Sequence, residues 1–252
     1  MEQDLQDRMK CYENVFRYNL PYRTPIIIRV DGKAFHTHTR GLKKPYDEKL
    51  FEVMNQTAIA LAKEITGSVL AYVFSDEISL LIQYYKKIDS QPYFDNNLQK
   101  IVSVASGIAS ARFTELSNII FNETRRAVFD ARAFVIPESE VNNYFISRQQ
   151  DCVRNSIAML AQSEFSHKEL DNKDSSQLQD LLMTKSINWN DYSSFYKRGR
   201  CIVKNIYYVS DSTIDNDVPH KVERHMWDVD NEIPIFSKDK NYIEGRMINE
   251  RC

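Results

Sequence analysis

The first half of the chain alternates short apolar runs with longer stretches in which apolar residues recur at spacings of three and four. The short runs are rich in β-branched and aromatic residues and predict four strands, at residues 26–30, 69–74, 78–83 and 127–136. The longer stretches predict one helix from Asp47 to about residue 65 and another over about residues 96–116. Asp47 is expected to cap the first helix, and Gly67 to end it.

The order strand, helix, strand, strand, helix, strand is that of split βαβ domains with a ferredoxin-like topology. We therefore predict an α+β fold, with this domain over residues 1–137 and a helical and C-terminal region over residues 138–252 packed on it. Polar segments at residues 167–177 and 210–219 are expected to be surface loops. In this topology the first and third strands are antiparallel neighbours. Asp31, which ends the first, and Asp76, which begins the third, should therefore meet at one edge of the sheet.

Two carboxylates at one edge repel each other, and burying them without compensation costs several kcal/mol. A divalent cation removes this cost, and magnesium prefers one or two carboxylates together with water and phosphate oxygens. Two such ions can activate an attacking oxygen and stabilise a departing pyrophosphate. The alternative is that Asp31 and Asp76 are turn residues that cap neighbouring amides.

The composition of the chain limits which binding partners and which cellular location the sequence favours. The 252 residues are 42% hydrophobic, which is enough for a substantial core in one large domain or two smaller ones. A net charge of −2 provides no overall positive field, so an RNA partner would depend on local basic patches. The four cysteines form no CxxC pair, which favours reduced thiols and a cytoplasmic location over a zinc site. The charged start is not typical of a signal peptide, and no apolar run approaches the length of a membrane span.

Five segments, taken in order, carry a family resemblance: RVDGKAFH, KKPYD, VFSDEISLLI, FDARAF and RQQDCVRNSI. Together they resemble the successive motifs of the tRNA-histidine guanylyltransferase family, reverse polymerases that add nucleotides to RNA 5′ ends. The similarity extends over about residues 4–204. The resemblance implies a catalytic domain akin to the palm of ordinary polymerases, two magnesium ions, ATP or GTP as the activating nucleotide, tRNA and nucleoside triphosphates as substrates, and a homotetramer.

The resemblance also assigns roles to individual residues. It implies that Asp31, Asp76 and the backbone of Gly32 hold the metal ions, with Glu77 directed to the opposite face behind them. The residues expected to contact the nucleotide are Lys33, Phe35, His36, Lys44, Ser75 and Lys100. Lys44 and Lys100 match lysines that handle triphosphates, which need cations. The alternatives are that Lys100 is a solvated helix charge, that His36 is an ordinary surface residue and that Phe35 belongs to the core.

Basic residues elsewhere are candidates for RNA contact. Arg132 and Arg148 suit bidentate phosphate binding, although they could simply balance acids. In residues 187–204, aromatic side chains alternate with Lys197, Arg198 and Arg200, a mixture suited to phosphate contact and base stacking. A folded junction between a helix and a strand, with a charged rim, would look similar.

One stretch departs from the family pattern. Histidine-specific members carry His-Ile-Asn-Asn where this chain has Val153-Arg154-Asn155-Ser156, so only Asn155 remains. The departure points to the guanylyltransferase-like subset, which repairs 5′-truncated tRNAs with the 3′ part of the acceptor stem as template. We therefore predict a template-dependent 3′-to-5′ nucleotidyltransferase. The alternatives are addition of a single guanosine to histidine tRNA, a nucleotide-binding or RNA-binding palm without turnover, and cyclic-nucleotide synthesis.

Overall fold

The computed structural model describes residues 4–85, 89–122, 126–211 and 220–248. Its centre is one antiparallel sheet with the strand order β4-β1-β3-β2-β5-β6. The strands are β1 (Ile26–Gly32), β2 (Ser68–Phe74), β3 (Glu77–Ile82), β4 (Phe129–Val135), β5 (Arg200–Asp211) and β6 (His220–Asp230). All the predicted strands are present, and β1 and β3 are antiparallel neighbours as expected.

Helices cover both faces of this sheet. On one face, α3 (Glu48–Glu64) and α4 (Leu98–Phe121) pack against Ile28 and Val30 of β1. On the other face, α5 (Val141–Glu164) and α9 (Asn241–Ile248) pack against Ile27 of β1. Alternate residues of one strand therefore enter two separate cores, which explains why the run Ile26–Ile28 at the start of β1 is apolar on both faces.

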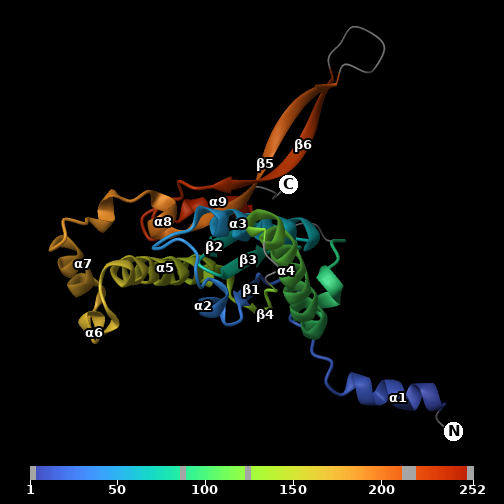
Figure 1. Cartoon of the computed structure of the whole chain (residues 1–252). Helices are drawn as coiled ribbons and strands as arrows, with labels where there is room; N and C mark the ends of the chain where they lie inside the picture. Colours follow the sequence, from blue (N-terminus) through green and yellow to red (C-terminus); the bar gives the residue numbers. More distant parts are fainter. Residues whose placement is uncertain (1–3, 86–88, 123–125, 212–219, 249–252) are drawn as a thin grey trace.

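The remaining elements lie around this centre. They are α1 (Leu5–Asn14), α2 (Phe35–His38), α6 (His167–Leu170), α7 (Ser175–Met183), α8 (Ser194–Arg198) and three short 3₁₀ turns at Tyr93–Asn96, Glu138–Glu140 and Trp189–Asp191. Helix α1 stands apart from the sheet, and β5 and β6 extend beyond it as a two-stranded ribbon (Figure 1). In the part of the chain that the structure describes, no helix has the length and apolar character to cross a membrane.

The predicted α+β, ferredoxin-like arrangement is confirmed, and so are the signals at the ends of the first predicted helix. The Asp47 carboxylate accepts hydrogen bonds from the backbone N–H groups of Lys49 and Leu50, at 2.9 and 3.2 Å, and so caps α3. Beyond the helix, Gly67 has a φ of +86°, a conformation that glycine adopts without strain. Tyr46 and Phe51, at the start of α3, line one pocket with Phe74 and Ser75, so the helix begins beside the turn between β2 and β3.

The prediction of a loop at residues 167–177 is wrong, because the segment contains the starts of α6 and α7. Each helix begins with a reciprocal capping box, formed by Ser166 with Glu169 and by Asp174 with Gln177. The polar residues there are thus helix-start signals. The loop predicted at residues 210–219 lies mostly outside the described residues, although β5 continues through its first two positions.

The sheet crosses the predicted domain boundary at residue 137. Strand β5, which belongs to the second part of the chain, pairs with β2 from the first, with Leu70 opposite Val203. The division into residues 1–137 and 138–252 stays a prediction. Both parts contribute strands to the sheet whose edge carries the candidate site.

Candidate functional site

The end of β1 and the start of β3 lie side by side at one edge of the sheet. In the strand register Asp31 is opposite Glu77, and the Gly32 N–H donates a hydrogen bond to the carbonyl oxygen of Asp76 at 3.2 Å. The structure therefore brings the two strand ends together as predicted. It does so through backbone pairing, so the position of the two aspartates follows from the sheet itself.

The backbone around these carboxylates is constrained. Ala34 and Ser75 both adopt left-handed conformations, with φ of 55° and 48°, which cost non-glycine residues about 1–3 kcal/mol each. A methyl group on Gly32 would lie only 2.1 Å from the ring of Phe35. That ring is held 5.1 Å from the rings of Phe113 and Phe129, measured between centroids, so it has little room to move. Gly32 is thus required by packing.

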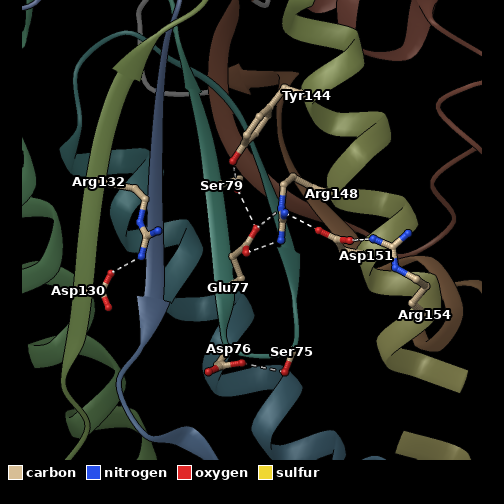
Figure 2. Close-up of polar contacts among 10 residues, drawn as sticks. All are labelled: Ser75, Asp76, Glu77, Ser79, Asp130, Arg132, Tyr144, Arg148, Asp151 and Arg154. Atoms are coloured by element: carbon tan, nitrogen blue, oxygen red, sulfur yellow. Dashed lines mark hydrogen bonds and ion pairs between the residues drawn. The ribbon is translucent and has the colours of Figure 1, made fainter. Parts of the chain in front are cut away.

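Figure 2 shows the polar contacts of the turn between β2 and β3. The Ser75 hydroxyl donates to a carboxylate oxygen of Asp76 at 2.9 Å. Burial raises the pKa of Asp76 above its ordinary value, and the negative charges of Asp31 and Glu77 raise it further, against hydrogen bonds that lower it. The carboxylate is therefore held in a site that disfavours its own charge, which a bound cation would correct.

The donor set fits magnesium better than a metal that needs a complete protein cage. Within the described residues, no group of three or more histidine, cysteine, aspartate and glutamate side chains is arranged to hold a metal ion. Asp31 and Asp76 supply two carboxylates, and magnesium commonly takes its other ligands from water and substrate phosphates. The pair therefore suits an ion that arrives with a nucleotide.

Glu77, next to Asp76, is turned away from it and is only 6% exposed. Its carboxylate accepts two hydrogen bonds from Arg148 of α5 (Figure 2). Arg148 is thus an ion-pair partner of a buried acid, which is the alternative that the sequence left open for it. Arg132 likewise pairs with an acid, Asp130, at 3.2 Å, but on the exposed surface of β4.

The candidate nucleotide contacts fall into two groups. Lys33, His36 and Lys44 are exposed and follow the end of β1 or precede α3, at the same edge of the sheet as Asp31. Phe35 is 6% exposed and its ring packs in the core, which is the alternative that the sequence left open for it; a nucleotide contact at this position stays a prediction. Its ring supports the backbone of Gly32.

Lys100 lies near the other end of the strands, away from Asp31 and Asp76. It sits in the first turn of α4, whose start is tied to the residues that precede β1 by a hydrogen bond from Leu98 N–H to the Tyr18 carbonyl at 2.9 Å. Phe113, which contacts Phe35, is thirteen residues further along the same helix, a rise of roughly 20 Å. One copy of the chain therefore does not bring Lys100 to the carboxylate pair. Its role in triphosphate handling stays a prediction.

A small pocket opens beside Ser75. Its lining includes Tyr46 and Phe51 at the start of α3, Asn155 of α5, and Arg200 at the start of β5. Arg200 is 2% exposed, and its guanidinium donates to the Asn55 side-chain oxygen at 2.7 Å and lies 4.5 Å from the Phe51 ring centroid. Burial lowers the pKa of Arg200 to about 10. Its predicted RNA contact is therefore wrong, because the side chain does not reach solvent.

The segment before β5 is the folded junction that the sequence left as an alternative. Tyr196 stacks on Tyr46 at 4.6 Å between ring centroids, and the Trp189 indole N–H donates to the Ser156 hydroxyl at 3.0 Å. Lys197 donates to the backbone carbonyl of Asn190 at 2.6 Å, and Arg198 to the Ser194 hydroxyl at 2.7 Å. These aromatic residues hold the junction together, while Lys197 and Arg198 remain partly exposed.

Sequence reasoning missed Arg200 as a buried residue and Ser156 as a hub of internal contacts. Arg200 directly precedes the apolar run Cys201–Ile202–Val203, and nothing in that local pattern distinguishes it from the exposed cations before it. The Ser156 hydroxyl also lies 2.9 Å from that of Tyr46. No pattern in the sequence indicates that contact, which spans 110 positions.

The fold and the paired carboxylates define the class, an α+β palm of the kind that nucleotidyltransferases use. The chain belongs to the tRNAHis guanylyltransferase (Thg1) family, whose family model matches residues 6–137. The tRNA(His) guanylyltransferase of Schizosaccharomyces pombe is 30% identical over 213 residues, which are 76% of this chain and 77% of the relative.

Two solved structures resemble the chain over nearly its whole length. A bacterial tRNA(His) guanylyltransferase (Thg1)-like protein in complex with ATP has a TM-score of 0.88 and 46% identity, and covers 96% of this chain and 98% of its own. A bacterial Thg1-like protein in complex with GTP has a TM-score of 0.80 and 42% identity, and the match covers 98% of this chain and 100% of that protein. These likenesses support membership of the Thg1-like subset.

Proposed function

We propose that this chain is a magnesium-dependent, template-directed nucleotidyltransferase that activates and extends the 5′ end of tRNA in the 3′-to-5′ direction. The meeting of Asp31 and Asp76 at the edge of the sheet carries the catalytic part of the proposal. The similar Thg1-like structures hold ATP and GTP, which supports a nucleoside triphosphate as the activating substrate. A homotetramer and a cytoplasmic location are proposed with it, on the family resemblance and on the spacing of the cysteines.

The reaction has two steps. In activation, an oxygen of the RNA 5′ phosphate attacks the α-phosphorus of ATP or GTP, and pyrophosphate leaves. In addition, the 3′-hydroxyl of the incoming nucleotide attacks the activated 5′ phosphorus, and the nucleoside monophosphate leaves. Bound magnesium would supply charge neutralisation and a more acidic attacking hydroxyl. Asp31 and Asp76 would hold it, and the exposed Lys33 and Lys44 would offset the charge of the triphosphate.

The stretch Val153–Ser156 supports template-directed choice over recognition of one anticodon. Ser156 is 3% exposed, and its hydroxyl is hydrogen-bonded to Tyr46 and Trp189, so its side chain offers no group to an RNA base. Arg154 pairs with Asp151. Asn155 is exposed, and it is the one residue of the four that matches the histidine-specific pattern. Specificity then comes from base pairing, because a mispaired nucleotide leaves polar groups unmatched and its 3′-hydroxyl misplaced.

A second candidate function is addition of one guanosine to histidine tRNA, which the names of the curated relatives favour. The two functions share activation and the carboxylate pair, so they differ only in the choice of nucleotide and tRNA. A palm without turnover is less well supported, since the strand ends that carry both aspartates are paired and intact.

The first experiment incubates purified chain with a 5′-truncated, 5′-monophosphorylated tRNA, ATP, magnesium and each nucleoside triphosphate in turn, and resolves the products on a gel. We expect growth by the nucleotide that pairs with the template. Asp31→Asn and Asp76→Asn should each lower the rate about a thousandfold or more, equivalent to at least 4 kcal/mol of transition-state stabilisation. Near-normal addition by either variant would refute the assigned site, and no addition by the wild-type chain would refute the activity.

A further inference from the structure

Four charged side chains form a continuous series of ion pairs from the turn between β2 and β3 to the surface of α5. Arg148 donates through Nε and Nη2 to the two carboxylate oxygens of Glu77, at 2.8 and 2.7 Å, and through Nη1 to Asp151 at 2.5 Å. The other oxygen of Asp151 accepts from Arg154. Figure 2 shows these contacts. The exposed fraction of the side chain rises along this series, from 8% for Glu77 through 16% for Arg148 and 28% for Asp151 to 61% for Arg154.

Glu77 needs this partner. A buried, unpaired carboxylate is costly, and Glu77 directly follows Asp76 and lies opposite Asp31, whose charges disfavour its own. The bidentate contact from Arg148 neutralises it, and the Ser79 hydroxyl donates a third hydrogen bond at 3.2 Å. These three hydrogen bonds fix the Glu77 carboxylate in one direction, away from Asp76.

Arg148 also contacts the other end of the turn. Phe74 and Glu77 are the paired residues that close it, and the turn between them holds Ser75 in a left-handed conformation and presents Asp76. The Arg148 guanidinium lies 5.4 Å from the centre of the Phe74 ring. One side chain from α5 therefore holds both residues that close the turn.

We propose that Arg148 is a positioning residue, which acts through Glu77 and Phe74 to fix the turn that presents Asp76 to the metal ion and nucleotide. The inference rests on the proposed function for the metal ion at Asp76 and for its kinetic readout. Lysine would keep the charge but would lose the planar group that bonds Glu77 twice and Asp151 once. The turn would then keep its fold and lose its fixed orientation.

The test compares Arg148→Lys, Glu77→Gln and the double variant with Arg112→Lys as a matched control. Arg112 pairs with Glu115 at 2.6 Å on the surface of α4. Three quantities are measured: Mn²⁺ binding by electron paramagnetic resonance without RNA or nucleotide, kcat and KM for nucleotide addition, and the unfolding temperature. A purely structural role would change only the last.

We expect each single variant to bind Mn²⁺ at least about threefold more weakly and to lose about tenfold or more in kcat, with KM changed less than about twofold. The double variant should be no worse than the poorer single variant, because both remove the same link. Arg112→Lys should match the wild type. Wild-type Mn²⁺ affinity and kcat in both single variants would overturn the inference, even with a lower unfolding temperature.

Two further outcomes are assigned in advance. If Arg148→Lys does not fold, Asp151→Asn replaces it in the test, because it removes the ion pair that Arg148 makes on its more exposed side. This variant should lower Mn²⁺ affinity and kcat by a smaller factor. No change in either would overturn the inference. If the wild-type chain adds no nucleotide but Arg148→Lys weakens Mn²⁺ binding, the proposed activity fails and the positioning role stands.

Discussion

Gly32→Ala tests whether packing by Phe35 sets the backbone at the end of β1. An added methyl carbon would lie 2.1 Å from one ring carbon of Phe35 and 2.4 Å from another, where ordinary contacts need more than 3 Å. The ring is enclosed by Phe113 and Phe129, so relief requires the core or the strand end to shift. Overpacking of this kind costs about 1–3 kcal/mol, or roughly 2–12 °C in unfolding temperature for a chain of this size.

Gly107→Ala is the matched control, because a methyl group there meets nothing within 4 Å on the exposed face of α4. It should stabilise the protein by about 0.5–1 kcal/mol. Urea unfolding measures both variants, and Phe35→Leu in the Gly32→Ala background should recover part of the loss through a coupling above about 0.5 kcal/mol. If Gly32→Ala is as stable as the wild type and keeps its activity, the steric account of this glycine is refuted.

Three further substitutions probe charge at and around the site. Burial and the charge of Asp31 raise the pKa of Asp76 above its ordinary 3.8, so ionisation of this carboxyl group costs folding stability as the pH rises past that value. Asp76→Asn should therefore raise the unfolding temperature of the metal-free protein at neutral pH, whereas Glu115→Gln, at an exposed position, should not. Lys44→Ala should slow activation of 5′-monophosphorylated RNA about tenfold or more, and addition to 5′-triphosphorylated RNA less, while Lys63→Ala at the far end of α3 has no effect; equal slowing on both RNAs would give Lys44 a general role. Arg200→Met should leave the salt dependence of tRNA affinity unchanged, and a shallower slope would show a phosphate contact despite its burial.

Much of the fold was predictable because its signals are local. The strands are short apolar runs, the helices have apolar residues at helical spacing, and Asp47 and Gly67 mark the ends of α3. The order of these elements then predicted that Asp31 and Asp76 meet, without any distance being known. The error at residues 167–177 had a local cause too, since the capping pairs Ser166 with Glu169 and Asp174 with Gln177 were present in the sequence.

The details of the site depended on contacts between distant residues, which local patterns do not encode. Phe35 follows Asp31 closely and was expected to contact nucleotide, but Phe113 and Phe129 enclose its ring. Arg200 and Lys197 looked alike in a basic, aromatic segment, yet only Arg200 enters the sheet and becomes buried. Burial of a charged side chain is decided by the elements that pack over it.

The most direct test of the proposed function is the choice of nucleotide when the template is changed. Truncated tRNAs with histidine and non-histidine anticodons are prepared with each base at the templating position of the acceptor stem, and the added nucleotide and its rate are measured for every combination. We predict that the added nucleotide follows the templating base, with similar rates for all anticodons. Guanosine insertion opposite every template, together with a strong preference for the histidine anticodon, would contradict template-directed repair and indicate a dedicated guanylyltransferase.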